Sequence, residues 1–259
     1  MLFGHSLGKL LPIGALVGVG IALMPETGAS AESSSAASAC PSGMLLIEGQ
    51  HCPDAVQKCL EWNDPPHYHH YRCARYQKPA TCISVRKHLR FCIDRDEYAE
   101  PGKPDKPGKS NDAMPLVNKT WNEAKAICRA RGARLCKDAE WEFACEGPDM
   151  SPYPYGFERD SSLCNIDRSE DLGEPGTKRV DHRAPVSAYP ECTSSFGVHN
   201  MVGNVDEWVE REDPSLPNRA ALRGGWWAPG RNRCRAATTS HAETYSGKQV
   251  GFRCCKNAR

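Results

Sequence analysis

The stretch PLVNKTWNEAKAICRARGARLCKDAEWEFACEG, residues 115–147, carries the clearest signals of regular structure in the chain. Thr120 and Glu123 fit a capping box, in which each side chain satisfies a free backbone amide of the other residue at the start of a helix. Gly132 is typical of the residue that follows a helix end. We therefore predict one helix that begins after Thr120 and a second helix at residues 138–147.

Short strands are predicted on both sides of these two helices. Residues 43–49 (GMLLIEG) and 85–98 (VRKHLRFCIDRDEY) predict the first two strands, with Val85 and Phe91 as apolar anchors of the second. After the second helix the chain is rich in turn residues, and further strands are predicted at 208–211, 221–227 and 250–255. The pattern predicts one irregular, loop-rich α+β domain.

The N-terminal segment has the features of an export signal. An apolar run at residues 10–24 follows a lysine and is too short to span a bilayer. Small residues at 29–31 offer a site for signal peptidase. We therefore predict a signal peptide at residues 1–31, a serine-rich linker at 32–39 and a single domain at 40–259.

Charge and cysteine usage limit the possible partners and the compartment. The 33 basic and 32 acidic residues leave a net charge of +1, which gives no field for steering nucleic acid or an anionic membrane. All 14 cysteines follow the predicted cleavage site, and an even number in an exported chain indicates disulfides. We expect an extracytoplasmic (secreted or periplasmic) protein with no nucleic-acid partner and, after signal cleavage, no membrane association. Its partner is expected to be a protein, a peptide or another extracytoplasmic ligand.

Residues 51–84 form a cysteine-rich insert that also contains a histidine cluster. Three histidines, His67, His69 and His70, lie between Cys59 and Cys73, a composition that suggests a zinc site. However, the histidine spacing does not match a closed zinc site, and cysteines of exported chains normally form disulfides. We expect the histidines to lie on a solvated loop.

Taken in order, several of these segments resemble the formylglycine-generating-enzyme, or sulfatase-modifying-factor, family. The motifs that carry the resemblance are GMLLIEG, FCIDRDEY, the stretch at 115–147, YPYG, FGVHNMVGNVDEW, ALRGG and GFRC. The resemblance covers residues 43–255, with the insert at 51–84 as an addition. It implies the family fold, an irregular variant of the C-type lectin fold, here held together by disulfides.

The oxidases of this family convert a cysteine of a substrate protein to formylglycine with oxygen and copper(I). Two cysteines after the Arg-Gly-Gly element hold the metal, because copper(I) is a soft ion that prefers thiolates. Four and nine residues after Gly225 stand Pro229 and Cys234. Counting back from Cys254 instead matches Cys234 to a structural cysteine paired with Cys145. Neither count yields a cysteine pair, so we do not expect copper, and Cys234 is a catalytic candidate only if the protein is an enzyme.

The resemblance also implies a disulfide between Cys128 and Cys254, beside the pair Cys145–Cys234. Cys254 and Cys255 are neighbours on a predicted strand, where successive side chains point to opposite faces, so we expect them to have separate partners. Cys136 and Cys164 both lie near the two-helix stretch and are a possible further pair.

The resemblance further implies calcium, which prefers oxygen ligands from tight turns. Four residues of the HNMVGNVDEW stretch match one set of family ligands: Asn200, Gly203, Val205 and Glu207. A second set begins at Asn165 and Ile166. Its acidic ligand is left open among three candidates: Asp167, Asp171 and Asp181.

Two tryptophans follow the Arg-Gly-Gly element. Alternation on a strand would place one of Trp226 and Trp227 in the core and expose the other. An exposed indole beside Arg231, Arg233 and Arg235 would form a recognition surface, because aromatic and arginine side chains are enriched in interfaces.

The sequence thus predicts an exported, disulfide-rich sulfatase-modifying-factor-like domain that serves as a non-copper recognition or accessory module. The alternative is an oxidoreductase of the formylglycine-generating type that oxidises a protein cysteine. Whether the protein is an enzyme stays open at this point, because the copper-binding cysteine pair is not intact.

Overall fold

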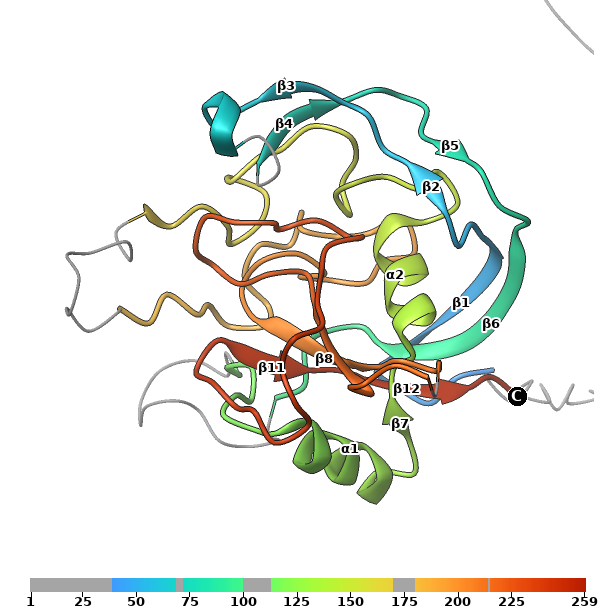
Figure 1. Ribbon diagram of the computed structural model, residues 1–259. Helices are drawn as coiled ribbons and strands as arrows, with labels where there is room; N and C mark the ends of the chain where they lie inside the picture. The colour runs from blue at the N-terminus through green and yellow to red at the C-terminus, as the bar shows by residue number, and fades with distance from the viewer. Residues whose placement is uncertain (1–38, 69–71, 100–112, 170–179, 214) are drawn as a thin grey trace, which may run out of the picture. The chain divides into compact units, whose positions relative to one another are not determined.

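A computed structural model describes residues 39–68, 72–99, 113–169, 180–213 and 215–259 (Figure 1). The predicted signal peptide at 1–31 and the linker up to residue 38 lie outside the described residues. The described residues all belong to one compact unit, Ala37–Arg259. No helix among them is long and apolar enough to cross a membrane.

The first sheet is antiparallel and has four strands in the order β1-β6-β12-β7. The strands are β1 (Met44–His51), β6 (Lys87–Asp94), β12 (Cys254–Asn257) and β7 (Arg134–Leu135). β1 and β6 are the first two predicted strands, and they pair over their whole length. Phe91 is buried as predicted. The sheet therefore joins the N-terminal hairpin to the last strand of the chain.

The second sheet has the order β10-β9-β8-β11, with β8 and β11 parallel. Its strands are β8 (Asp206–Glu210), β9 (Ala220–Arg223), β10 (Ala237–Thr238) and β11 (Val250–Phe252). β9 ends before the glycines of the Arg-Gly-Gly element, so it is shorter than the predicted strand at 221–227. The predicted strand at 250–255 is two strands, β11 and β12, which belong to different sheets.

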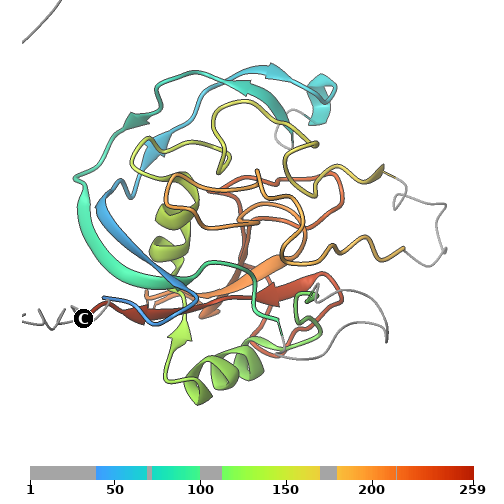
Figure 2. The ribbon, with the colours of Figure 1, turned by 180° about the vertical axis from the view of Figure 1, so that it is seen from behind.

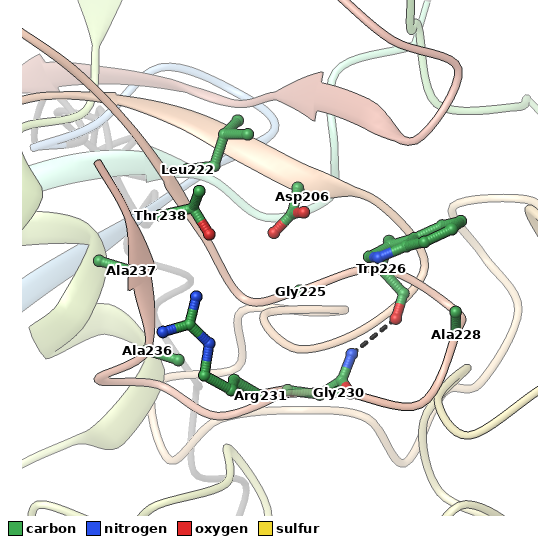
Figure 3. Close-up of a pocket in the computed structure, with 11 residues that line it drawn as sticks. Asp206, Leu222, Gly225, Trp226, Ala228, Gly230, Arg231, Ala236, Ala237 and Thr238 are labelled. Carbon is green, nitrogen blue, oxygen red and sulfur yellow. Dashed lines mark hydrogen bonds between the residues drawn. The ribbon is translucent and has the colours of Figure 1, made fainter. Parts of the chain in front are cut away.

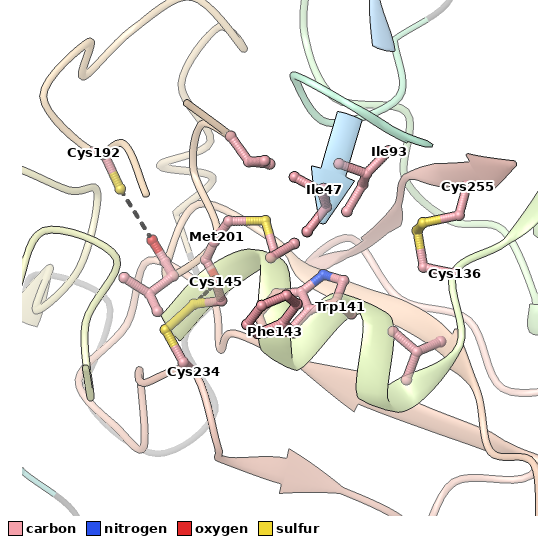
Figure 4. Close-up of a cluster of buried hydrophobic side chains, with 14 of the residues drawn as sticks. Ile47, Ile93, Cys136, Trp141, Phe143, Cys145, Cys192, Met201, Cys234 and Cys255 are labelled. Atoms are coloured by element: carbon pink, nitrogen blue, oxygen red, sulfur yellow. Dashed lines mark hydrogen bonds between the residues drawn. A yellow bond between two sulfur atoms is a disulfide. The ribbon is translucent and has the colours of Figure 1, made fainter. Parts of the chain in front are cut away.

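Two helices match the sequence predictions. In α1 (Trp121–Ala130) the capping box is present: Thr120 N–H donates to Glu123 Oε2 at 2.8 Å, and Glu123 N–H donates to Thr120 Oγ1 at 3.2 Å. α2 (Asp138–Glu146) ends at Gly147, which has a φ of 65°. Trp141 and Phe143 of α2 belong to the main buried cluster together with Ile47 of β1 and Met201 (Figure 4).

The cysteine-rich insert extends the β1–β6 hairpin as a bent ribbon, seen in cyan in Figures 1 and 2. Its elements are β2 (Ala55–Val56), β3 (Cys59–Trp62), the 3-10 helix η1 (Pro66–Tyr68), β4 (Cys73–Tyr76) and β5 (Thr81–Cys82). β2 pairs with β5, and β3 pairs with β4. The prediction that Val85 is an apolar anchor is wrong, because Val85 follows this ribbon and is 86% exposed.

All fourteen cysteines form seven disulfides. The pairs are Cys40–Cys92, Cys52–Cys82, Cys59–Cys73, Cys128–Cys254, Cys136–Cys255, Cys145–Cys234 and Cys164–Cys192. Both pairs implied by the resemblance are present. As predicted, Cys254 and Cys255 have separate partners: Cys254 is bonded to Cys128, and Cys255 is bonded to Cys136. Cys136 is therefore not bonded to Cys164, because β7 and β12 are adjacent strands that bring it to Cys255.

Candidate functional site

The Arg-Gly-Gly element forms a turn that only glycine permits. After Arg223 the chain passes through Gly224 and Gly225, which have φ values of 88° and 74°. A Cβ on Gly224 would lie 2.7 Å from the carbonyl oxygen of Met201, and one on Gly225 would lie 2.6 Å from Nδ2 of Asn232. The loop after β9 is therefore folded tightly against these two residues.

A cavity of about 150 Å³ lies beside this turn (Figure 3). Its lining includes polar and apolar side chains from β8, β9, β10 and the loop between the last two, among them Asp206, Leu222, Trp226, Ala228, Arg231 and Thr238. Figure 3 shows the Asp206 carboxylate, the Thr238 hydroxyl and the Arg231 guanidinium bordering one space. The cavity thus combines one acidic group, one basic group and one indole.

Asp206 is the acidic group of this cavity. Burial raises the pKa of its carboxyl group to about 7, although a hydrogen bond from the backbone of Gly225 and the charge of Arg231 act in the opposite direction. A carboxyl group with a strongly raised pKa inside a cavity is typical of a binding or catalytic site. Asp206 comes from β8 and is an addition to the predicted surface of tryptophans and arginines, which all lie after β9.

The two tryptophans differ in burial, as alternation along a strand suggests, although they lie in a loop after β9. Trp226 is half-buried and lines the cavity, and its carbonyl accepts a 2.6 Å hydrogen bond from Asn232 Nδ2. Trp227 is only 2% exposed and packs with Val117 and Val205. The predicted role of Trp227 in a recognition surface is therefore corrected to a core role.

The three arginines of the predicted surface point to different partners. Arg231 lines the cavity. Arg233 Nη1 donates to the hydroxyl of Tyr76 in the insert at 3.3 Å. Arg235 forms two 2.6 Å hydrogen bonds to the carboxylate of Glu146 on α2. Of the three, the structure brings only Arg231 together with Trp226, while Arg233 and Arg235 fasten the loop to the insert and to α2.

Cys234 is fully buried and bonded to Cys145 of α2 (Figure 4). It therefore has no thiol group to act as a catalytic residue or a copper ligand in this state. Pro229, the other position of the family count, has no side-chain donor. The residues of this loop do not fit a copper(I) site that needs two thiolates.

The turn before β8 contains the first predicted set of calcium ligands. Asn200 is buried, and its Oδ1 has no hydrogen-bond partner in the described part of the chain. Its Nδ2 donates to Glu97 Oε2 at 3.2 Å and to the carbonyl of Val186 at 3.1 Å. A buried amide oxygen without a donor is the kind of ligand that calcium uses.

Glu97 is a buried acidic residue at this turn that the sequence analysis missed. Its carboxyl group accepts hydrogen bonds from Asn200 and, at 2.9 Å, from Asn204 Nδ2. Burial, together with the negative charge of Glu207, raises the pKa of Glu97 to about 8. The only available signal was its place in FCIDRDEY, three residues after the end of β6.

Of the other members of this set, Glu207 is already paired, and Gly203 and Val205 would bind an ion only through their backbone carbonyls. Both carboxylate oxygens of Glu207 accept hydrogen bonds from Arg253 at 2.7 Å, and one also accepts from Trp141 Nε1. Gly203 has a φ of 81°, and a Cβ there would lie 2.3 Å from the carbonyl oxygen of Asn165. The side chain of Val205 packs in the cluster of Trp227. Asn200 is thus the member of the set with an unpaired side-chain oxygen.

The second predicted set lies beside the first. The Oδ1 of Asn165 accepts from Arg168 Nε at 3.0 Å, and Ile166 is fully buried in the core. Among the candidate acidic ligands, Asp167 pairs with Arg159 at 2.7 Å and Asp181 pairs with Arg183 at 2.6 Å. Asp171 lies outside the described residues. This set stays a prediction.

The comparison with known families gives one match that covers most of the chain. Residues 61–258 match the model of the sulfatase-modifying factor enzyme 1-like domain. The chain therefore belongs to the sulfatase-modifying-factor, or formylglycine-generating-enzyme, family. The match begins within the cysteine-rich insert and ends at the last strand.

Curated relatives include both inactive and active members by name. The chain is 30% identical over 178 residues to the inactive C-alpha-formylglycine-generating enzyme 2 of Bos taurus, a match covering 64% of this chain and 58% of the relative. It is 32% identical over 184 residues to the formylglycine-generating enzyme of Thermomonospora curvata, covering 58% and 59%. The chain thus spans about three fifths of the length of these relatives.

A solved structure supports the fold. The crystal structure of CarF superposes with a TM-score of 0.52 at 16% sequence identity, covering 83% of this chain and 97% of that chain. At this identity the likeness concerns the fold alone. The irregular architecture with few helices and several small sheets is therefore shared with a solved protein.

Proposed function

We propose that this protein is a recognition or accessory module of the sulfatase-modifying-factor family that works outside the cytoplasm without copper. The observation that carries the proposal is the disulfide between Cys145 and Cys234, since all other cysteines are also paired. The loop that holds copper in the oxidases of the family therefore offers no thiolate. Its binding site is the cavity beside Trp226, and its ligand is a protein, a peptide or another extracytoplasmic molecule.

The seven disulfides support an oxidising compartment, because such bonds persist mainly in exported proteins. Removal of residues 1–31 during export is part of the proposal. Cys40 is bonded to Cys92 and leaves no thiol for a lipid anchor. Sequencing the N-terminus of the exported protein tests the cleavage site, and a start at residue 32 is expected.

Calcium at the turn before β8 is also part of the proposal. Asn200 would bind the ion through Oδ1, with Glu97 and Glu207 as the nearby acidic residues. Bound calcium would supply positive charge beside the buried carboxyl group of Glu97, whereas Glu207 is already paired with Arg253. Asn200, for its part, links the turn to Val186 through its Nδ2. The role of the ion would be to hold the turn in place.

The decisive experiment is reconstitution with copper(I). The purified oxidised protein is titrated with copper(I) and then given oxygen and a peptide that contains a Cys-x-Pro-x-Arg motif. The formylglycine-generating enzyme of Thermomonospora curvata serves as the positive control. We expect no stoichiometric copper binding and no change in peptide mass, whereas one-to-one binding with oxygen-dependent turnover would reject the proposal.

The alternative function is oxidation of a protein cysteine, and the relative named formylglycine-generating enzyme is the observation in its favour. This activity would require reduction of the Cys145–Cys234 bond, because the family chemistry uses thiolates. The same copper(I) titration after mild reduction addresses it. Activity that appears only after reduction and disappears in Cys234→Ser would support the alternative.

A further inference from the structure

Two opposite charges face the cavity beside Trp226 without forming an ion pair. Asp206 and Arg231 both line this cavity, and the Arg231 charge acts on the Asp206 carboxyl group. Arg231 is exposed at the rim of the cavity, and within the described ranges no ion pair joins it to Asp206. Opposite charges that line one cavity attract each other, and they stay apart where the backbone holds them in place or another group lies between them.

The backbone around both residues is well anchored. Asp206 is the first residue of β8, where it pairs with Val250 of β11, and its carboxylate accepts a hydrogen bond from the backbone of Gly225. The loop that carries Arg231 is tied back by the 2.6 Å hydrogen bond from Asn232 Nδ2 to the carbonyl of Trp226. Asp206 and Arg231 therefore border the cavity from two different segments, each of which is held in place by backbone contacts (Figure 3).

We propose that this cavity binds a small zwitterion, with the ligand's ammonium group against Asp206 and its carboxylate against Arg231. The inference rests on the proposed function, because it places the ligand in the same cavity. An ammonium group would add donors to the one that the backbone of Gly225 already supplies to the Asp206 carboxylate. Guanidinium groups bind carboxylates through paired N–H donors, which suits the outer position of Arg231.

The size and walls of the cavity limit the ligand further. A cavity of about 150 Å³ is large enough for a molecule about the size of benzene. Leu222, Ala228 and Ala237 provide an apolar wall for a short methylene chain. The Thr238 hydroxyl and the Asn232 amide are further polar groups of the lining. The ligand class is therefore an amino acid with a short chain between its amino and carboxyl groups.

Isothermal titration calorimetry on the oxidised, copper-free protein tests this assignment. The probes are glycine, β-alanine and 4-aminobutyrate, with ethylamine and propionate as ligands that carry a single charge. At least one amino acid of the series is expected to bind more tightly than either single-charge probe, by about tenfold or more. The change in tryptophan fluorescence on binding, compared with that of Trp226→Phe, provides a second readout.

Variants assign the two contacts. Asp206→Asn keeps the shape of the side chain and removes its charge, and Arg231→Gln does the same at the rim. Each is expected to weaken binding of the best amino acid about tenfold or more. The matched controls are Asp149→Asn and Arg129→Gln, which change exposed residues outside this cavity and should leave binding unchanged. Because Arg231 is exposed, its substitution tests the proposal even if Asp206→Asn does not fold.

Three results would overturn the assignment. They are no binding by any amino acid of the series, binding that survives Arg231→Gln unchanged, and ethylamine binding as tightly as the best amino acid. Each can occur while the copper(I) titration stays negative, which would leave the proposed function intact. Copper-dependent peptide oxidation would instead reject the proposed function, and it is measured separately because the calorimetry contains no copper.

Discussion

Nη2 of Arg253 lies 2.7 Å from Oε1 of Glu207, and neither residue exposes more than 1% of its surface. Arg253 stands between β11 and β12, where the chain passes from the second sheet to the first. Its Nη1 also donates to the carbonyl of Asp94, at the end of β6, at 3.2 Å. One buried guanidinium thus connects β8 of the second sheet with β6 of the first.

Removal of Arg253 is expected to be strongly destabilising. Arg253→Met leaves the Glu207 carboxylate buried without its cation, which typically costs about 3–5 kcal/mol. Urea unfolding without reductant measures the loss. The control is Arg219→Met, which removes a 2.8 Å ion pair to Glu210 from an arginine that is 49% exposed, and should cost less than about 1 kcal/mol. Similar losses in the two variants would contradict this account of Arg253.

Calcium is expected to raise the melting temperature of the protein. An ion that binds only the folded state stabilises it by RT ln(1 + [L]/Kd), so the midpoint should increase with calcium concentration. Asn200→Leu removes the unpaired Oδ1 and should abolish the increase, while magnesium should have a smaller effect because it requires a stricter geometry. A melting midpoint that does not respond to calcium in the unaltered protein would dispose of the site.

The Cys145–Cys234 bond is expected to contribute to stability and to leave no reactive thiol. The double variant Cys145→Ser, Cys234→Ser should lower the free energy of unfolding by about 2–5 kcal/mol, since the bond closes a loop with a sequence separation of 89. Thiol titration of the unaltered protein in denaturant should detect no free cysteine, and peptide mapping without reductant should recover the pair. A free thiol at Cys234 would overturn the copper argument.

The pH dependence of stability is expected to have a contribution from Glu146. Burial, partly offset by Arg235, raises the pKa of the Glu146 carboxyl group from 4.5 to about 7. The folded chain therefore holds this proton more tightly than the unfolded chain. The resulting stabilisation is complete below pH 4.5 and is lost as the pH rises through about 7.

Glu146→Gln should flatten this part of the profile, because glutamine does not titrate. The free energy of unfolding is measured from pH 5 to pH 8 for both proteins, beside Glu158→Gln as a control at an exposed glutamate. The difference between the unaltered protein and Glu146→Gln should change with pH, and the control should follow the unaltered protein. If the free energy of unfolding changed with pH in the same way in all three proteins, Glu146 would not contribute to the pH dependence of stability.

Local signals predicted the regular elements well. The capping box at Thr120 and the glycine after α2 depend on residues within one or two helical turns, so a short stretch of sequence contains all the relevant contacts. The same reasoning wrongly predicted that Val85 is buried, because apolar character alone does not show whether a side chain faces the core. The two disulfides from the resemblance rest on family motifs that this chain keeps.

The candidate site was predicted only in part, because some of its residues come from distant positions in the sequence. Trp226 and Arg231 are close in sequence and were predicted together, whereas Asp206 reaches the same cavity from β8. Glu97 meets Asn200 across more than 100 residues of chain. No local pattern reports such contacts, because they depend on how the two sheets and their loops come together.

By itself, the sequence determined the helices, the family and the absence of a second cysteine in the loop after the Arg-Gly-Gly element. These depend on residue identity and short-range spacing. Only the tertiary structure decided that Cys136 pairs with Cys255, that Trp227 is core, and that Asp206 and Arg231 face one cavity unpaired. The physical reason is that pairing, burial and charge compensation are set by neighbours in space, which the chain supplies from distant positions.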